Sequence, residues 1–416
     1  MVSNLLYFKL DKNCVVLKHI LLLLVTTILC SNSYGQGSNQ SIARVWYDVL
    51  LNAIRTDFAR PTVHARNLYH LSIAHYDAFH AYDPSKETFL LGKDLNGWST
   101  PFDGVPDVED IDSARHEAIC YASYKLLYHR FQNSPGFSGV IVKMDSVMLS
   151  HDYGFDMVST DYVNGGPKEF GNYIASQIIS YGLQDGSNEQ NNYGNLYYQT
   201  VNPPIEVEES GNPDIIDPNR WQAISLTTSI DQSGNPVASS PPHLSPEWGN
   251  VDPFSLDDSL ITTFSRNSND YNVYFNPGEP AYIDTTDTLG LSSLYKWNFC
   301  IVSVWQSHLD PNDGVMIDIS PASRGGLSSY PQNKEDYPAF YDFFDGGVQP
   351  ATGYALNPVT GVPYDPQVVP MGDYGRVLAE FWADGIDSET PPGHWFEILH
   401  TVTDHPLFEK KWMGLG

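Results

Sequence analysis

Three features of this sequence predict a mainly α-helical fold with long ordered loops. In several segments, apolar residues recur at intervals of three and four, which is the spacing of one face of an amphipathic helix. These segments are bounded by proline or by Asp-Gly and Asp-Pro pairs, which are typical of helix ends. Between residues 185 and 286, the chain is instead rich in Asn, Pro, Gly, Ser and Asp and has no sustained helical spacing.

The periodic segments define the predicted helices. We expect helices over residues 42–54, 61–83, 112–131, 170–183, 291–308, 374–383 and 394–402. The second begins near Pro61, because proline suits the first turn of a helix, and it ends at the pair Asp83-Pro84. In the third, Ala114, Ala118 and Ala122 form a seam of small side chains.

The stretch 185–286 is interpreted as long ordered loops with short helices or strands. We expect Trp221, Trp248 and Phe254 to pack it onto the helical body. A loop region of this length is unusual inside a compact domain, so an inserted subdomain is the alternative. The predicted organisation is thus a helical region at 36–184, a loop-rich region at 185–286 and a second helical region at 287–416.

The first 35 residues have the layout of a secretory signal peptide. Lysines precede an apolar run from Ile20 to Leu29, which is too short to span a bilayer, and small residues precede Gln36. We therefore expect cleavage before Gln36 and a secreted or periplasmic protein with no membrane attachment after cleavage. Residues 1–35 are the predicted signal peptide.

The charge and the cysteines restrict the possible partners. A net charge of −28 argues against nucleic acid and against anionic membranes. Cys14 and Cys30 lie in the signal peptide, which leaves Cys120 and Cys300. In an exported protein these two form one disulfide or remain as two buried thiols, and the sequence does not choose between them.

The usual catalytic and metal-binding motifs are missing. The sequence has no H-E-x-x-H, G-x-S-x-G, P-loop or G-x-G-x-x-G motif. Glu397 and His400 give one E-x-x-H pair, whereas a carboxylate-bridged di-iron bundle needs two pairs and two further glutamates. Residues 310–314 resemble the start of a calcium loop, but no glutamate closes the loop at its twelfth position, so an acidic helix-capping loop is favoured.

Several histidines are crowded into the second helix. His64, His70, His75 and His80 are five or six residues apart, so they fan around the helix and do not share one face. We expect some of them to be buried and bonded to a backbone carbonyl or to Asp77. No residue of the sequence is assigned a catalytic, cofactor-binding or metal-binding role on its own pattern.

Six blocks resemble, in the same order, segments of the bacterial vanadium-dependent haloperoxidases. They are 55–70, 185–193, 217–222, 245–249, 308–323 and 381–395. The last, from Phe-Trp-Ala-Asp-Gly to Pro-Pro-Gly-His-Trp, is the most specific. The resemblance runs from about residue 41 to the end of the sequence and implies an incomplete helical bundle of the haloperoxidase type.

The resemblance also implies a chemistry. Members of this family share a superfamily with certain acid phosphatases and bind vanadate as a phosphate mimic. Peroxide adds to the vanadium, a halide ion attacks the bound peroxide, and hypohalous acid or an equivalent results. The protein supplies two arginines and a lysine for the oxyanion and a histidine for acid–base work.

The three short motifs that supply those groups in the family are not matched here. Arg60 belongs to the only Arg-Pro pair, but Ala53 stands where the first motif has lysine. Residues 391–394 read Pro-Pro-Gly-His where the second has serine before the glycine, so we interpret His394 as structural. Ser323-Arg324 begins a match to the third, but no histidine follows before His394. Vanadate is therefore implied by the family, with no binding residue found.

The sequence is expected to be the N-terminal portion of such a protein and inactive alone. Residues 408–416 run to the end without a helix cap or a charged tail, and the family's vanadate motifs follow this region. A frameshift, a split gene or a sequence boundary would each account for this, and the missing part would be a lost segment or a companion chain. The alternatives are a non-catalytic exported protein that binds a partner through 185–286, and a superfamily acid phosphatase, which would need the same motifs.

Overall fold

The structure is a computed structural model of the chain. It describes residues 40–226, 230, 236, 243–284, 286, 294–324, 331–341, 353–382, 385 and 388–403. In these residues the protein is mainly α-helical, and its strands form only two-stranded sheets. The predicted helical fold class with long loops is confirmed. The predicted signal peptide and the end of the chain lie outside the described residues.

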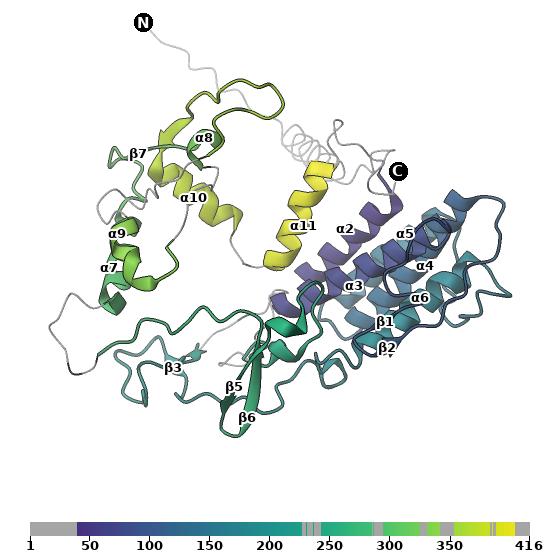
Figure 1. Cartoon of the computed structure of the whole chain (residues 1–416), viewed down its shortest axis with the longest axis horizontal. Coiled ribbons are helices and arrows are strands. Elements are labelled where there is room, and N and C mark those ends of the chain that lie inside the picture. Colours follow the sequence, from purple (N-terminus) through teal and green to yellow (C-terminus); the bar gives the residue numbers. More distant parts are fainter. Residues whose placement is uncertain are drawn as a thin grey trace, which may run out of the picture.

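The N-terminal body, residues 42–182, is a set of helices that pack side by side (Figure 1). Its helices are α2 (Ile42–Arg55), α3 (Pro61–His80), α4 (Ile111–Phe131), α5 (Phe137–Ser150) and α6 (Pro167–Gly182). Their starts follow ordinary capping chemistry. Ser41 Oγ accepts from the backbone N–H of Arg44 at 3.3 Å, and the Asp110 carboxylate accepts from the first turn of α4.

The core of the body is continuous and well covered. Trp46, Leu50, Leu71 and Phe131 have no exposed surface, and each belongs to the same apolar cluster. Burial of one such side chain contributes about 1.5–3 kcal/mol to folding. The apolar faces predicted for α2, α3 and α4 therefore point into one core.

Helices α4 and α6 approach each other closely because small residues line their contact. Ala114, Ala118 and Ala122 are buried, as the alanine seam predicts. A Cβ placed on Gly171 of α6 would lie 2.3 Å from the carbonyl oxygen of Ala118. No side chain other than hydrogen fits at this position, so glycine sets the distance between the two helices.

Helix α5 was not predicted from the sequence. Its buried residues Val140, Met144, Val147 and Met148 do have helical spacing. However, Val142 and other apolar residues continue around the exposed side, and this blurs the amphipathic pattern.

The loop-rich region is ordered largely by side chains that bond to the backbone. Asn202 Oδ1 accepts from the N–H groups of Ile216 and Asp217 at 3.0 and 2.8 Å, and its Nδ2 donates to the Asp217 carbonyl at 2.9 Å. The Glu247 carboxylate accepts from three consecutive N–H groups at 196–198. These bonds replace the ladders that regular structure would provide.

The aromatic residues expected to pack this region behave differently from one another. Phe254 contacts the helical body through Tyr69, with ring centroids 5.0 Å apart. Trp248 contacts Tyr193 of the loops, and Trp221 is 57% exposed, with its ring against that of His243. The expectation was therefore wrong for Trp221, because the loops are held by hydrogen bonds and need no buried indole there.

The remaining short elements are distributed along the loops. They are β1 (Asp94–Leu95), β2 (Trp98–Ser99), η1 (Glu189–Asn191), β3 (Ile205–Glu206), β4 (Ile224–Ser225), η2 (Trp248–Asn250), η3 (Asp258–Leu260), β5 (Thr262–Arg266) and β6 (Asn269–Val273). Strands β5 and β6 form a hairpin with Thr262 opposite Val273, and β3 pairs with β4 in parallel.

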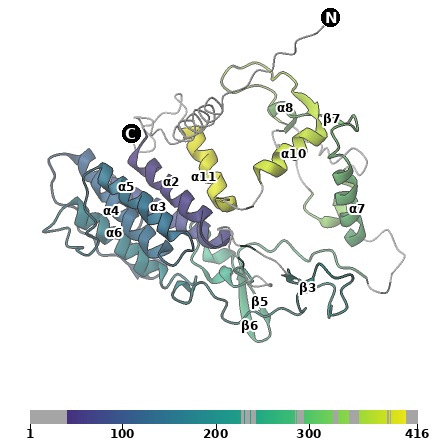
Figure 2. The ribbon, with the colours of Figure 1, turned by 180° about the vertical axis from the view of Figure 1, so that it is seen from behind.

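The C-terminal part contains further helices that are less enclosed. Its elements are α7 (Leu294–Ser307), β7 (Met316–Asp318), α8 (Pro321–Arg324), η4 (Lys334–Asp336), α9 (Tyr337–Phe340), β8 (Val368–Pro370), α10 (Met371–Phe381) and α11 (Thr390–Thr403). Helix α11 lies against α2 and α3, whereas α7, α8 and α10 lie away from the body in both views (Figures 1 and 2).

The two cysteines of the described residues and the lengths of the helices answer two further questions that the sequence raised. Cys120 is buried and accepts from Trp46 Nε1 at 3.4 Å, and Cys300 is exposed, so the two thiols are free and not joined. Within the described ranges, no helix has both the length and the apolar character needed to cross a membrane.

Candidate functional site

The first and last of the family-like blocks meet at α11. Arg55 Nε donates to Glu389 Oε2 at 3.0 Å, and Arg55 Nη2 donates to Glu397 Oε1 at 2.6 Å. His394 Nδ1 lies 2.5 Å from the other oxygen of Glu389. One arginine near the end of α2 therefore fixes two carboxylates and, through Glu389, one imidazole of the Pro-Pro-Gly-His-Trp block.

A second contact between the same blocks is buried. His64 Nδ1 lies 3.1 Å from Thr390 Oγ1, and His64 Nε2 lies 3.2 Å from Asp57 Oδ2. Burial raises the pKa of Asp57, but the bond with His64 and the charge of Arg60 outweigh it and hold that pKa below its usual value. Thr390 has φ +59°, which is rare for a β-branched residue, so this contact holds a strained start to α11.

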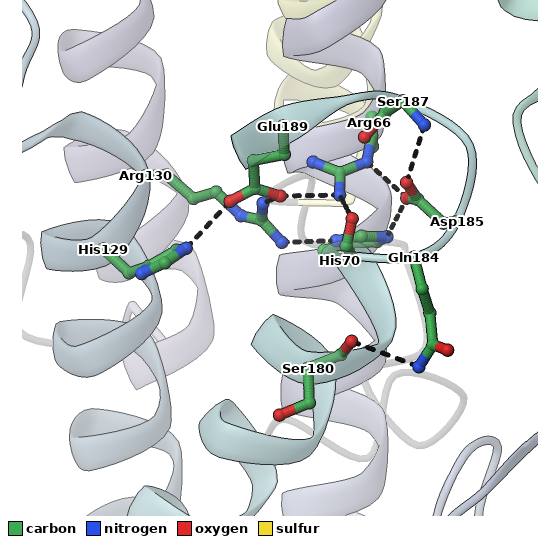
Figure 3. Close-up of polar contacts among 10 residues, drawn as sticks. Arg66, His70, His129, Arg130, Ser180, Gln184, Asp185, Ser187 and Glu189 are labelled. Atoms are coloured by element: carbon green, nitrogen blue, oxygen red, sulfur yellow. Dashed lines mark hydrogen bonds and ion pairs between the residues drawn. The ribbon is translucent and has the colours of Figure 1, made fainter. Parts of the chain in front are cut away.

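A further polar site lies where α3, α4 and α6 meet the loop after α6. We call it the arginine cluster; its members are Arg66, His70, His129, Arg130, Asp185 and Glu189. Arg66 Nε donates to Asp185 Oδ2 at 2.5 Å, and Arg66 Nη2 donates to Glu189 Oε2 at 2.7 Å (Figure 3). Arg130 forms an ion pair with the same oxygen of Glu189.

The histidines complete the arginine cluster from two sides. His70 Nδ1 accepts from Arg130 Nη2 at 2.9 Å, and His70 Nε2 lies 3.8 Å from Asp185 Oδ2. His129 Nε2 lies 2.8 Å from Glu189 Oε1. The side chain of His129 is 30% exposed, whereas that of Arg130 is only 1% exposed, so His129 marks the solvent side of the cluster.

Backbone geometry lets these groups converge. Arg66 and His70 are one turn apart on α3 and therefore share a face. Gly182, the last residue of α6, lies against both guanidinium groups, and a Cβ there would be 2.5 Å from Arg66 Nη2 and 2.7 Å from Arg130 Nη2. Its carbonyl accepts from Arg66 Nη2 at 2.8 Å.

The loop 185–193 presents both carboxylates to the helices. Asp185 accepts from the Ser187 N–H at 3.0 Å, and its own carbonyl accepts from the Asp252 N–H at 2.8 Å. Asn188 and Asn192, which flank η1, have φ of +57° and +53°. Asparagine tolerates this left-handed conformation better than most residues, so the loop can turn Glu189 inward.

The arginine cluster is close to electrically neutral. Two guanidinium groups face two carboxylates, and both histidines resist protonation. Burial, followed by the charges of Arg66 and Arg130, lowers the pKa of His70 well below its ordinary value. Burial and the same two charges lower the pKa of His129 to about 4. Burial also lowers the pKa of Arg130 to about 9, which still leaves it charged at pH 7.

The residues of the three partial motifs do not fit vanadate. Arg60 donates to Asn192 at 2.8 Å, and Arg324 donates to the Asp318 carbonyl at 3.2 Å in the distant α8 (Figure 1). His394, the third partial match, is held by Glu389 next to α10. Each of the three residues is therefore bonded to another partner, and the arginine cluster is already neutralised by its own carboxylates.

The other metal-like patterns resolve into ordinary contacts. Glu397 pairs with Arg55, and His400 contacts Arg44, so the E-x-x-H pair is divided between two arginines. In the 310–314 loop, Asp310 caps its own turn through the Asn312 N–H at 2.9 Å. In the part of the chain that the structure describes, no group of three His, Cys, Asp or Glu side chains is placed to hold a metal ion.

The expectation that some histidines of α3 are buried is confirmed for His64, His70 and His75, but the expected partners were wrong for these three, which bond to other side chains. His80 Nδ1 bonds to the Tyr76 carbonyl at 3.0 Å, and His75 Nε2 lies 2.8 Å from Ser123 Oγ. The expected partner Asp77 is used differently, since it accepts from the N–H groups of residues 89–91.

Sequence reasoning did not find the arginine cluster as a site. Arg66, Asp185 and Glu189 lie in two of the family-like blocks, but their pairing joins residues more than a hundred positions apart. Arg130 lies in no block. No local signal separates Arg130 from the other charged residues of its helix, such as Arg115 and Lys125.

Among known proteins, only solved structures match this chain. No protein-family model matches the sequence, and no curated protein is significantly similar to it. Among solved structures, the chain is similar to an apo-type bacterial vanadium-dependent chloroperoxidase, with a TM-score of 0.37 and 14% identity over 61% of this chain and 49% of that one. The holo-type structure gives a TM-score of 0.37 and 13% identity, over 61% and 48%. The chain spans about half the length of these structures, and a TM-score of this size does not establish a common fold.

Proposed function

We propose that this chain is the N-terminal part of an exported vanadium-dependent haloperoxidase-like protein and has no haloperoxidase activity alone. In this proposal it forms a helical scaffold, and the vanadate-binding part packs on it as a missing segment or a companion chain. The observation that carries the proposal is the outward face of α11, which is apolar on a helix whose inner face is already packed.

The inner face of α11 is occupied by the body. A Cβ on Gly393 would lie 3.1 Å from Leu51, which shows how closely α11 approaches α2. The ring of Phe396 lies 5.3 Å from that of Tyr47, and the ring of His400 lies 5.2 Å from it. These α11 residues repeat at three and four and so form one helical face.

The outward face of α11 follows the same spacing and has no charge. Trp395, Leu399 and Val402 are 61%, 49% and 52% exposed. The Trp395 ring lies 5.4 Å from that of Trp382, so the apolar surface continues onto the end of α10, where Phe381 is 49% exposed. Helices that are apolar on two sides are normally enclosed on both, and an exposed apolar patch marks an interaction site.

The order of the family-like blocks supports the proposed identity. The first and the last block bind each other through Arg55 and His64, as described above. Export is proposed from residues 1–35 alone. The peroxide-dependent oxidation of halide belongs to the complete protein in this proposal, because this sequence lacks the three motifs that would hold vanadate.

A turnover assay tests the inactivity. The purified chain is mixed with hydrogen peroxide, bromide, orthovanadate and an organic acceptor, and bromination is followed by absorbance. We expect no rate above that of the same mixture without protein. Vanadate-dependent bromination by this chain would overturn the proposal.

A dye that fluoresces on apolar surface tests the scaffold role. We expect binding by the wild type and reduced binding by Trp395→Glu. Val359→Glu is a matched control, because Val359 is also exposed, at 87%, and lies outside α10 and α11. Equal dye binding by all three proteins would contradict the missing layer and would favour a complete, non-catalytic binding protein.

A further inference from the structure

The carboxylate of Glu189 has the donor set of a bound oxyanion. One of its oxygens receives Arg66 Nη2 at 2.7 Å and pairs with Arg130, and the other lies 2.8 Å from His129 Nε2. The carboxylate reaches both guanidinium groups from one side and the imidazole from the other (Figure 3). Two buried guanidinium groups and an imidazole are the donors that proteins use for phosphate-type anions.

Glu189 does not use all the donors that surround it. Arg66 Nη1 and Ser187 Oγ are buried and have no hydrogen-bond partner among the described residues, whereas Arg130 also bonds to the Tyr193 hydroxyl. Buried donors without partners are unusual and destabilising. A carboxylate offers two oxygens, whereas a tetrahedral oxyanion offers four. Arg66 and Ser187 therefore have donors in reserve for a ligand with more oxygens than the Glu189 carboxylate.

Glu189 lies in the loop after α6, whereas both arginines of the cluster lie on helices of the body. It lies in η1, a single turn in the surface loop, where Gln190, Asn191 and Asn192 are all exposed. The guanidinium groups are carried separately by α3 and α4. Removal of the Glu189 side chain would leave both arginines in place and open the site toward solvent beside His129.

We propose that Arg66, Arg130 and His129 form a binding site for a tetrahedral oxyanion of the phosphate type, and that Glu189 fills it as an internal ligand. Without Glu189, two guanidinium groups face only the carboxylate of Asp185, so the site has a net positive charge. The site is separate from the three partial vanadate motifs, and it does not depend on the haloperoxidase proposal. In the conformation described, the internal carboxylate competes with any external anion.

Replacement of Glu189 by a residue that vacates the site is the direct test. Glu189→Ala is compared with the wild type by thermal unfolding in inorganic phosphate and in chloride at equal ionic strength. We expect phosphate to raise the unfolding midpoint of Glu189→Ala on the order of 5 °C more than that of the wild type, at a concentration about 100 times its dissociation constant. Isothermal titration with phosphate should show one site in the variant and none in the wild type.

Two matched variants separate binding in the arginine cluster from the general stabilising effect of phosphate. Glu189→Gln keeps the shape of the side chain and still fills the site, so its phosphate response should stay below that of Glu189→Ala. Glu87→Ala removes an exposed carboxylate that pairs with Lys93 at 3.0 Å, and should respond like the wild type. Arg130→Gln in the Glu189→Ala background should abolish phosphate binding.

Each outcome decides the proposal. If Glu189→Ala folds but gains nothing from phosphate beyond the gain of Glu87→Ala, the arginine cluster is only a structural salt-bridge network. If Glu189→Ala does not fold in chloride, refolding in phosphate is expected, and failure in both salts overturns the proposal. Equal phosphate binding by the wild type overturns the internal-ligand role of Glu189.

Discussion

The helices of the N-terminal body enclose one continuous apolar core, whereas α7 and α10 of the C-terminal part bury almost none of their side chains. Seven of the fourteen residues of α2 are buried, and Trp46 and Leu50 have no exposed surface. Among the described residues of α7 only Ile301 is buried, and in α10 only Gly372 is buried. The body therefore has its own core, whereas the apolar faces of α7 and α10 are largely exposed among the described residues.

The largest expected difference between the two regions concerns their tryptophans. Trp46 is fully buried, donates to Cys120 and packs edge-on against Tyr124 with centroids 6.4 Å apart. We expect Trp46→Ala to lower the free energy of unfolding by about 3–5 kcal/mol, because the cavity cannot close. Urea unfolding measures this. A loss below about 1 kcal/mol would show that the body is not a close-packed core.

The contact between α4 and α6 gives a somewhat smaller effect. Gly171→Ala places a methyl group against the Ala118 carbonyl, and the two helices must separate. We expect a loss of about 1–3 kcal/mol in unfolding free energy, which exceeds the gain in helix propensity.

Gly139→Ala in α5 is the matched control for Gly171→Ala. A Cβ at Gly139 would meet nothing within 4 Å, so alanine should be neutral or stabilise the protein by about 0.5–1 kcal/mol. If the two variants have the same stability, the close approach of α4 and α6 is not what requires glycine at position 171.

Acid should weaken the body through its buried histidines. Burial lowers the pKa of His75 to about 3, from an ordinary value of 6.5. As the pH falls below 6.5, His75 binds a proton in the unfolded chain but stays neutral in the folded protein. The free energy of unfolding therefore falls between pH 6.5 and about 3. Below that window the loss is complete.

Comparison with His75→Gln isolates this contribution from that of other groups. Asp77 has a raised pKa, which acts in the opposite direction and is common to both proteins. We expect the stability advantage of the wild type over the variant to shrink as pH falls from 7 to 4, as measured by urea midpoints. Parallel pH curves would show that His75 is not held neutral.

The helices were predictable from the sequence because their signals are local. Apolar spacing placed α2 and α4 within a residue or two of their observed bounds, since one buried face sets that spacing. Helix α5 was missed because Val142 extends its apolar surface into solvent. The expectation that Trp221 is buried was also wrong. Aromatic residues are buried only on average, and the loop around Trp221 is held by hydrogen bonds to the backbone.

The arginine cluster was much less predictable than the fold. The block that contains Arg66 and the block that contains Asp185 and Glu189 were both visible in the sequence. Their contact depends on how α3, α4 and α6 pack, and Arg130 carries no local pattern that points to its partners. Periodicity reports which residues are buried, but it does not report which buried charges meet.

The smallest expected effect completes the comparison. Trp395 is as large as Trp46 but is 61% exposed, and its nearest ring neighbour is Trp382. We expect Trp395→Ala to change the unfolding free energy by less than about 0.5 kcal/mol, because little surface leaves water there. A loss above about 2 kcal/mol would mean that the chain covers this face itself, and the proposed missing layer would be unnecessary. If Trp395→Ala is nearly as stable as the wild type while Trp46→Ala is much less stable, α11 packs on the core with one face only. Its other face would then be available to another polypeptide segment.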